Sequence, residues 1–267
     1  MIYDCLIVGA GPAGLSAAKQ LARYSYRIAL FERRKVGGLL NNANRIENYL
    51  GFEDLTGAEL VKQFTKNLKP QVRFEEVQEI HQSEVGFRLK TERAWYEART
   101  VLVASGTEPL RFPHAKAYYD LLEFPLRSKK KRVLILGGGD VGFDYALQLK
   151  RRGFLPSIYT HHKSSCLPIL KKRAQEAGIP VRENANVKKI DFTAVDHVLI
   201  AIGRRVAQPK IHVQKNADGL YFAGDVSHPE LRQVHIAAGE GLNAALKIHN
   251  FLTNASDRSR KRVRANR

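Results

Sequence analysis

The sequence opens with Tyr3-Asp4-Cys5-Leu6-Ile7-Val8, followed at once by Gly9-Ala10-Gly11-Pro12-Ala13-Gly14. The first six residues form an almost continuous apolar run, which is typical of a parallel strand buried on both faces. The first glycine permits a tight turn, the second lets the backbone approach a diphosphate, and the third lets a helix pack closely on the strand. The helix N-terminus then presents free N–H groups and a positive dipole. The stretch therefore predicts a dinucleotide site.

A carboxylate completes this first unit. Residues 27–31 form a returning strand, and Glu32 ends it, 18 positions after Gly14. A carboxylate at this place accepts hydrogen bonds from the ribose hydroxyls of an unphosphorylated nucleotide. A glycine turn alone is weak evidence, but strand, spacing, helix and terminal acid together favour an adenine dinucleotide, FAD or NAD, without a 2′-phosphate.

A second copy of the unit follows in the middle of the chain. An apolar run at 132–136 precedes Gly137-Gly138-Gly139-Asp140-Val141-Gly142, with glycines at the same three offsets. The position that corresponds to Glu32 is Thr160, and His161-His162-Lys163 follow it. Donors have replaced the acceptor, so this copy is expected to accept a 2′-phosphate, which favours NADPH, with NADH as the alternative. A nucleotide fold that binds nothing is the competing interpretation.

Length and cysteine content limit the classes of protein to which this chain can belong. A chain of 267 residues can bury a large core, and two linked domains are expected. Met1 leads directly into the first strand, without a basic leader or a run long enough to span a membrane, which predicts a cytoplasmic protein. Cys5 and Cys166 are the only cysteines, too few for a disulfide framework or a cysteine metal site. Cys5 is expected in the core, and Cys166 in a loop.

The chain is strongly basic, with a net charge of +18. Residues 257–267 contribute +5 of this, which leaves +13 on the body. Such a field attracts acidic proteins, anionic cofactors or nucleic acid, although a solvated basic surface is an equal alternative. The tail, residues 255–267, is charged and poor in large apolar groups, so it is expected to be disordered, and nucleic-acid binding, if any, is assigned to it.

Short motifs outside the two glycine units occur in a fixed order. They are Gly37-Gly38-Leu39-Leu40, Glu47-Asn48-Tyr49-Leu50-Gly51-Phe52, Ala104-Ser105-Gly106, Gly224-Asp225 and Arg232-Gln233-Val234. This order resembles the thioredoxin-reductase branch of the flavoproteins with two dinucleotide-binding domains. Leu39 replaces that branch's glutamine and Leu50 its proline, whereas Asn48 stands where its flavin-contacting asparagine does.

The resemblance implies an α/β fold with two Rossmann-like dinucleotide-binding domains of the three-layer ββα type, the FAD domain being discontinuous. Residues 1–111 and 207–254 would form the FAD domain, and 112–206 a shortened NAD(P)H domain. Residues 72–100 are expected to form an antiparallel meander, 110–131 the crossing between domains, and 236–252 the last helix. The implied cofactors are FAD and NADPH, with NADH possible, and the implied assembly is a homodimer.

The residues expected to bind the two cofactors lie in the glycine turns, at strand ends and in the motifs of the resemblance. They are Gly9, Gly11, Pro12, Ala13, Gly14, Glu32, Arg33, Gly38, Leu39, Leu40, Asn48, Val77, Ala104, Ser105, Gly106, Gly137, Gly139, Asp140, Val141, Gly142, His161, His162, Lys163, Gly203, Gly224, Asp225, Arg232, Gln233 and Val234.

The dithiol of the thioredoxin reductases is missing. Where that group carries Cys-x-x-Cys, this chain has Asp120-Leu121-Leu122-Glu123, and disulfide exchange requires a thiolate. The expected function is an FAD-dependent NAD(P)H oxidoreductase that passes electrons to an external acceptor, such as a small acidic ferredoxin- or flavodoxin-like protein. No catalytic acid–base residue and no metal are required. The alternatives are a non-catalytic flavin or nucleotide sensor whose basic tail binds polyanions, and a thiol enzyme that uses Cys166.

Overall fold

The computed structural model describes residues 1–114, 117–214 and 216–265, with the backbone alone for 255–265. The chain folds into two compact units. Unit 1 comprises Met1–Leu40, Glu59–Thr107 and Val206–Arg267, and unit 2 comprises Asn41–Ala58 and Glu108–Arg205. Both units are α/β with parallel strands, which confirms the predicted fold class.

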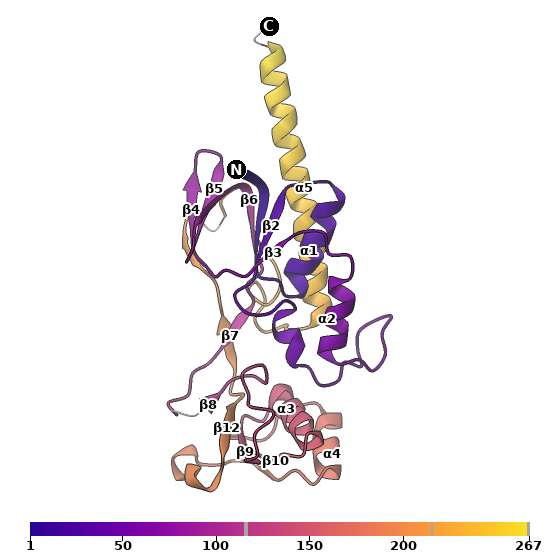
Figure 1. The fold of residues 1–267 in the computed structure, drawn as a ribbon, viewed down its shortest axis with the longest axis vertical. Helices are drawn as coiled ribbons and strands as arrows, with labels where there is room; N and C mark the ends of the chain where they lie inside the picture. Colours follow the sequence, from indigo (N-terminus) through magenta and orange to yellow (C-terminus); the bar gives the residue numbers. More distant parts are fainter. Residues whose placement is uncertain (115–116, 215, 266–267) are drawn as a thin grey trace. The chain divides into compact units, whose positions relative to one another are not determined.

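An eight-stranded sheet organises unit 1, in the order β14-β4-β5-β6-β1-β2-β3, with β15 also paired to β6. Strands β1, β2, β3 and β15 belong to the parallel part, and β4, β5 and β6 form the antiparallel meander predicted for residues 72–100 (Figure 1). The strands are β1 (Ile2–Val8), β2 (Ile28–Phe31), β3 (Val72–Arg73), β4 (Val77–Ser83), β5 (Gly86–Thr91), β6 (Trp95–Val103), β14 (Lys210–His212) and β15 (Leu220–Phe222).

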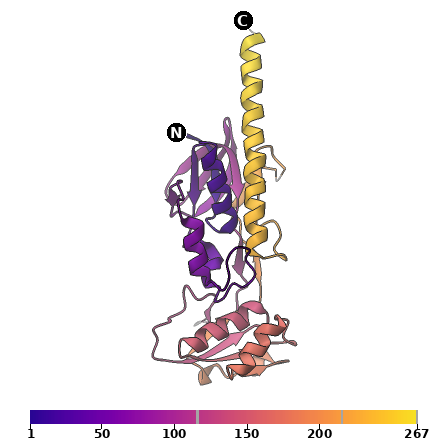
Figure 2. The ribbon, with the colours of Figure 1, turned by 90° about the vertical axis from the view of Figure 1, so that its right-hand side faces the viewer.

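Alternation along β1 separates two halves of the core. Cys5 and Ile7 pack on the helix side, whereas Leu6 and Val8 pack against the meander. Successive side chains of a strand point to opposite faces, so one apolar run supplies both layers. The helices of unit 1 are α1 (Pro12–Arg23), α2 (Gly57–Thr65), which begins in the Asn41–Ala58 segment, and α5 (Val234–Ala265). Helices α1 and α5 lie side by side on one face of the sheet (Figure 2).

Helix α5 is longer than the sequence analysis predicted. The expected end was residue 252, followed by a disordered tail, whereas the backbone is helical to Ala265. The added segment is rich in arginine and lysine, which favour helix, and contains no glycine or proline to end it. Residues 266–267 of the predicted tail lie outside the described residues. Although α5 has 32 residues, neither it nor any other described helix combines the length and hydrophobicity needed to span a bilayer.

Unit 2 contains a five-stranded, all-parallel sheet in the order β11-β10-β9-β12-β8. Its elements are β8 (Ala117–Tyr118), β9 (Arg132–Leu136), β10 (Leu155–Tyr159), β11 (Val181–Arg182), β12 (His197–Ile200), α3 (Asp140–Arg151) and α4 (Pro168–Glu176). Three single turns of 3-10 helix complete the list: η1 (Gly38–Asn42), η2 (Val187–Lys189) and η3 (Phe192–Ala194). The chain passes between the units through β7 (Thr107–Pro109) and β13 (Arg204–Val206), which pair with each other.

Two segments differ from the sequence analysis. Residues 110–131, expected to be a crossing between domains, are packed into unit 2 with the rest of the predicted 112–206 domain, and Leu121 and Phe124 are buried in its core; residues 115–116 of that stretch lie outside the described residues. The segment Asn41–Ala58, assigned to the first domain, also belongs to unit 2. Gln148 donates to the backbone carbonyl of Asn42 there, at 3.1 Å. Such contacts join residues about 100 positions apart, which no local pattern reveals.

Candidate functional site

The first glycine turn of unit 1 leaves no room for side chains at its two outer positions. A side-chain carbon on Gly9 would collide with the carbonyl oxygen of Ala104, and one on Gly14 would collide with the carbonyl oxygen of Gly9. Gly9 also has a φ of +104°, which favours glycine. At Gly11, by contrast, no atom of the described residues, its chain neighbours aside, lies within 4 Å of such a carbon. The middle glycine therefore borders open space at the start of α1.

Helix α1 begins in a way that suits an anion. Gly11 is its N-cap and supplies no side-chain cap, Pro12 occupies the first turn, and no acidic residue lies there. The first N–H groups of the helix are thus left for another partner. The open space at Gly11 and the uncapped helix fit a diphosphate.

Glu32 is buried and points back to this turn. Its Oε2 accepts a hydrogen bond from the Ala10 N–H at 3.0 Å, and its Oε1 accepts one from the Arg34 N–H at 2.8 Å. A carboxylate has about four lone-pair sites, so it retains capacity for ribose hydroxyls. Arg33, the next predicted residue, forms a surface ion pair with Glu76 at 3.3 Å.

The loop after β2 folds onto the same turn. Gly37 N–H donates to the carbonyl of Ala10 at 2.7 Å, and Gly38, with a φ of +53°, lies against the Cα of Gly11. Leu39 is half-buried and Leu40 is buried. Unit 1 thus brings the predicted loop and the glycine turn together.

The Gly224-Asp225 turn and the start of α5 close the other side. Gly224, with a φ of +80°, lies against the side chain of Ala13, so a carbon added to it would be 3.0 Å from that methyl group. A carbon on Gly241 would collide with the carbonyl oxygen of Ala13, which shows how closely α5 approaches α1. The first turn of α5 also contains no acidic residue. Two helix N-termini therefore meet at one place in unit 1.

Glu240 is a residue of this site that the sequence analysis missed. Its Oε2 accepts a hydrogen bond from the Gly224 N–H at 2.6 Å, and its Oε1 lies 2.7 Å from Nδ1 of His228. It holds the turn through a contact 16 positions away. The sequence gives one signal for this role of Glu240, which is that a carboxylate stands about two turns into the helix that follows a Gly-Asp turn.

Ser105 supplies an independent indication of a ligand. Its Oγ is buried and, within the described part of the chain, has no hydrogen-bond partner. Buried polar groups are nearly always paired, so this hydroxyl is available to a bound molecule. Gly106 follows with a φ of +69°. Val77, also predicted to bind the cofactor, is 7% exposed in the core under the meander, which leaves only its backbone for a ligand.

Unit 2 repeats the design of the first turn. A side-chain carbon on Gly137 would collide with the carbonyl oxygen of Ala201, and one on Gly142 with that of Gly137. At Gly139, the middle glycine and N-cap of α3, the nearest atom to such a carbon is Oγ of Ser165, 3.9 Å away. The same closed, open, closed pattern therefore recurs at a second helix N-terminus.

The two units differ at the end of the strand that follows the turn and helix, which is β2 in unit 1 and β10 in unit 2. A side-chain carbon on Gly138 would lie 2.7 Å from Oγ1 of Thr160, so Thr160 packs where Glu32 packs on Ala10 in unit 1. The next two residues, His161 and His162, are exposed, and their rings stack 4.6 Å apart at 6°. Lys163 is exposed as well. The carboxylate of the first site is replaced by an exposed group of donors.

The loop that carries these donors folds back on the second turn. Ser165 N–H donates to the carbonyl of Gly138 at 2.9 Å, and Leu167 N–H donates to Oδ1 of Asp140 at 2.7 Å. Asp140, predicted to contact the cofactor, thus positions this loop. Val141 is 42% exposed. Gly203, which follows β12 with a φ of +129°, faces Leu110.

Not every predicted residue joins these clusters. Asn48 lies in the Asn41–Ala58 segment of unit 2, so it is not part of the site that unit 1 builds by itself. Arg232 and Gln233 are exposed and precede α5, which begins at Val234. The prediction of a flavin contact for these residues stays a prediction.

Neither cysteine has the surroundings of a reactive thiol. Cys5 is fully buried, and burial raises the pKa of its thiol to about 12. Burial also raises the pKa of the Cys166 thiol, and the carboxylate of Asp140 adds to that rise. The thiolate is the nucleophilic form, so both residues are kept in the unreactive form at neutral pH.

Asp144 of α3 gives unit 2 an unusual pH dependence. Its carboxylate accepts a hydrogen bond from the Asn44 N–H at 2.9 Å, and burial raises its pKa from 3.8 to about 6. The folded protein then holds this proton more tightly than the unfolded chain, so this group makes stability fall as the pH rises from about 4 to about 6. Asp144→Asn is expected to stabilise the protein at pH 8, by on the order of 1–3 kcal/mol in chemical denaturation.

Asp196 serves as a control because its pKa is shifted in the opposite direction from that of Asp144. Its bonds to Arg132 lower its pKa to about 2, so its contribution is present above pH 4 and is lost as the pH falls toward 2. Asp196→Asn is expected to destabilise at pH 8. Equal effects of the two substitutions would contradict this assignment.

Two glycine turns of this kind, each between a parallel strand and an uncapped helix, define a protein with two dinucleotide-binding units. The chain belongs to the pyridine nucleotide-disulphide oxidoreductase family, whose model matches residues 3–241. It is therefore a flavin-dependent NAD(P)H oxidoreductase, and FAD and NADPH are the cofactors of the thioredoxin reductases in this family.

Known relatives cover nearly the whole chain. A thioredoxin reductase from Ureaplasma parvum is 31% identical and aligns over 94% of this chain and 97% of its own. The thioredoxin reductase of Bacillus subtilis is 26% identical over 94% of this chain and 95% of its own. The crystal structure of T. acidophilum thioredoxin reductase superimposes with a TM-score of 0.79 at 26% identity, covering 93% of this chain and 98% of that one.

Proposed function

We propose that this chain passes electrons from NADPH through FAD to an external acceptor without using a dithiol of its own. One contrast carries the proposal. Both glycine turns keep the open middle position and uncapped helix that a dinucleotide needs, whereas the sequence holds only Cys5 and Cys166, whose thiols have raised pKa values. Redox chemistry in this chain is therefore assigned to the cofactors.

In this proposal, unit 1 binds FAD. The N-terminus of α1 faces the diphosphate and that of α5 faces the pyrimidine ring of the flavin. Gly11 lets the backbone approach the diphosphate, and Ser105 donates a hydroxyl that has no partner among the described residues. Glu32 accepts hydrogen bonds from the ribose, since the Ala10 and Arg34 amides already hold it at the turn. When bound, the flavin accepts a hydride from reduced nicotinamide and releases the electrons to an acceptor.

Unit 2 is assigned to NADPH. Gly139 and the start of α3 would hold the diphosphate, and the exposed donors His161, His162 and Lys163 would hold the 2′-phosphate. Thr160 supplies no carboxylate to repel that phosphate. The same absence leaves NADH without its usual ribose acceptor, which is why NADPH is preferred in this proposal.

The proposed acceptor is a small acidic electron-transfer protein of the ferredoxin or flavodoxin kind. A body charge of +13 supports this, because a positive field speeds encounter with an acidic partner. The proposal further includes a homodimer, which sedimentation can test, and a cytoplasmic location, which the sparse cysteines fit.

Anaerobic titration tests the function. The purified protein is expected to be yellow, NADPH is expected to bleach the flavin band, and the Cys5→Ser/Cys166→Ser double variant is expected to be reduced at the same rate. When an acceptor is then added to the NADPH-reduced protein, an acidic ferredoxin should reoxidise the flavin, whereas oxidised thioredoxin should not.

Different failures of this titration would have different meanings. A colourless protein that FAD cannot reconstitute would end the proposal. Thioredoxin reduction by the wild type that is lost in Cys166→Ser would instead establish a thiol enzyme.

A further inference from the structure

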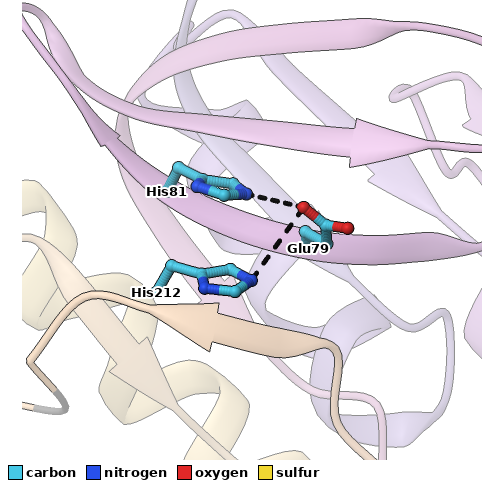
Figure 3. A group of neighbouring side chains, drawn as sticks. All are labelled: Glu79, His81 and His212. Atoms are coloured by element: carbon cyan, nitrogen blue, oxygen red, sulfur yellow. Dashed lines mark hydrogen bonds and ion pairs between the residues drawn. The ribbon is translucent and has the colours of Figure 1, made fainter.

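Three side chains outside both nucleotide sites converge at the edge of the unit 1 sheet (Figure 3). Glu79 and His81 stand two residues apart on β4, so they project from the same face. His212 lies on the neighbouring strand β14, directly opposite His81 in the parallel register. Ile80, between the two β4 residues, and Ile211, next to His212, pack into the core on the other face. Three chemically active groups are thus fixed by the strand pairing.

The rings and the carboxylate are close enough to share one small partner. Nε2 of His81 lies 2.8 Å from Oε2 of Glu79, and Nε2 of His212 lies 3.9 Å from the same oxygen. The two imidazole rings stack 4.3 Å apart at 14°. In Figure 3 both rings present an edge nitrogen to the carboxylate. Each of the three residues therefore offers one possible ligand atom, and these atoms all lie within 4.8 Å of one another.

An ordinary ion pair accounts for only part of this arrangement. The hydrogen bond between His81 and Glu79 is short, but 3.9 Å is too long for a hydrogen bond from His212. Two charged imidazolium rings at the observed spacing would also repel each other. The other carboxylate oxygen, Oε1, lies 3.6 Å from Nζ of Lys90, which leaves Oε2 directed at the histidines. A cation between the three groups would satisfy all of them.

We propose that Glu79, His81 and His212 bind a divalent transition-metal ion of the zinc class. Two imidazole nitrogens and one carboxylate oxygen form a known ligand set for zinc, with a fourth position left for water. Metal–ligand bonds of about 2.0–2.1 Å require donors roughly 3.3 Å apart. An imidazole nitrogen binds a metal in the plane of its ring, so the two stacked rings would have to turn toward each other to hold one ion. Lys90, paired with Oε1, orients the ligand carboxylate from outside the first sphere.

The proposed ion would join strands that are distant in the sequence. β4 begins at Val77, whereas β14 follows the return of the chain to unit 1 at Val206. β14 is short and lies at the end of the sheet order, where β4 is its one neighbour among the strands of the described residues. A metal at this place would hold the returning segment against the meander, independently of the nucleotide chemistry.

Trp95 provides a built-in probe for this site. It is the only tryptophan in the chain, and its ring lies 5.4 Å from that of His81. The full-length protein, freed of metals with a chelator, is titrated at pH 8 with Co²⁺, which quenches nearby tryptophan fluorescence. The expected result is saturable quenching with one ion per chain, reversed when Zn²⁺ displaces Co²⁺.

Variants decide whether the three residues are the ligands. Glu79→Gln and the edge-strand variant His212→Ala are each expected to weaken Co²⁺ binding more than about tenfold. His114→Ala, which removes a histidine from unit 2, should leave the titration unchanged. Flavin content and circular dichroism show that each variant is folded. Absence of quenching in the wild type, or equal quenching in all four proteins, overturns the proposal and indicates adventitious binding only.

Discussion

Gly11→Ala is expected to leave the protein folded and to lower its affinity for FAD by about 100-fold, or roughly 3 kcal/mol. Gly11 has φ −75° and ψ −175°, a conformation that any residue adopts. Apart from its chain neighbours, no atom of the described residues lies within 4 Å of the added methyl group. Only a ligand that fills this space would contact the added methyl group. FAD titration of the apoprotein, followed by flavin fluorescence, measures the loss, and circular dichroism checks the fold.

Gly14→Ala is the matched control, because it adds the same methyl group three positions later. There the carbon would collide with the carbonyl oxygen of Gly9, so α1 must move away from β1. We therefore expect a fall in thermal stability of unit 1 as well as loss of FAD. If Gly11→Ala bound FAD as tightly as the wild type, the diphosphate would not pass over this turn, and the assignment of unit 1 would be wrong.

The second large effect is expected in nucleotide preference. The triple variant His161→Ala/His162→Ala/Lys163→Ala should lower kcat/KM for NADPH by about 10- to 100-fold, since charge-assisted bonds to a phosphate are worth about 1.5–3 kcal/mol. The NADH reaction should change little, because NADH has no 2′-phosphate. All three side chains are exposed, so their removal should not affect stability. Steady-state rates with an artificial acceptor measure both preferences.

Adding Thr160→Glu to that triple variant should shift the preference toward NADH. Thr160 packs on the second turn residue Gly138, as Glu32 packs on Ala10, so a carboxylate there can accept from the Gly138 N–H and from ribose hydroxyls. An equal loss of NADPH and NADH activity in the triple variant would show that the loop holds a part common to both nucleotides, and not the 2′-phosphate.

Local sequence patterns predicted the two nucleotide units well. The three glycine offsets predicted which positions exclude a side chain, and the structure finds collisions at the outer two and space at the middle one in both copies. The nearly continuous apolar run of β1 predicted a strand buried on both faces, and its side chains do pack into both halves of the core. These features depend on residues within about 30 positions of one another, so a strand, turn and helix carry them wherever they occur.

Contacts between distant residues were missed for the same reason. The Glu240 carboxylate, on the helix that follows, accepts a hydrogen bond from the Gly224 N–H. The Asp144 carboxylate accepts one from the N–H of Asn44, 100 positions earlier, in the Asn41–Ala58 segment that belongs to unit 2. Helix α5 also runs 13 residues past its predicted end at 252. Charge and the lack of large apolar groups alone favoured disorder there, whereas continuation of a packed helix costs less than starting one.

The sequence by itself determined that this protein has two dinucleotide units, one with a carboxylate and the other with hydrogen-bond donors at its strand end, because glycine spacing and the Glu32/Thr160 exchange are local. Only the tertiary structure decided that the Ser105 hydroxyl has no partner in the described part of the chain, that α1 and α5 begin at one place, and that His212 meets Glu79 and His81. Those arrangements come from pairing between strands more than 100 positions apart, which chain order does not encode in any short pattern.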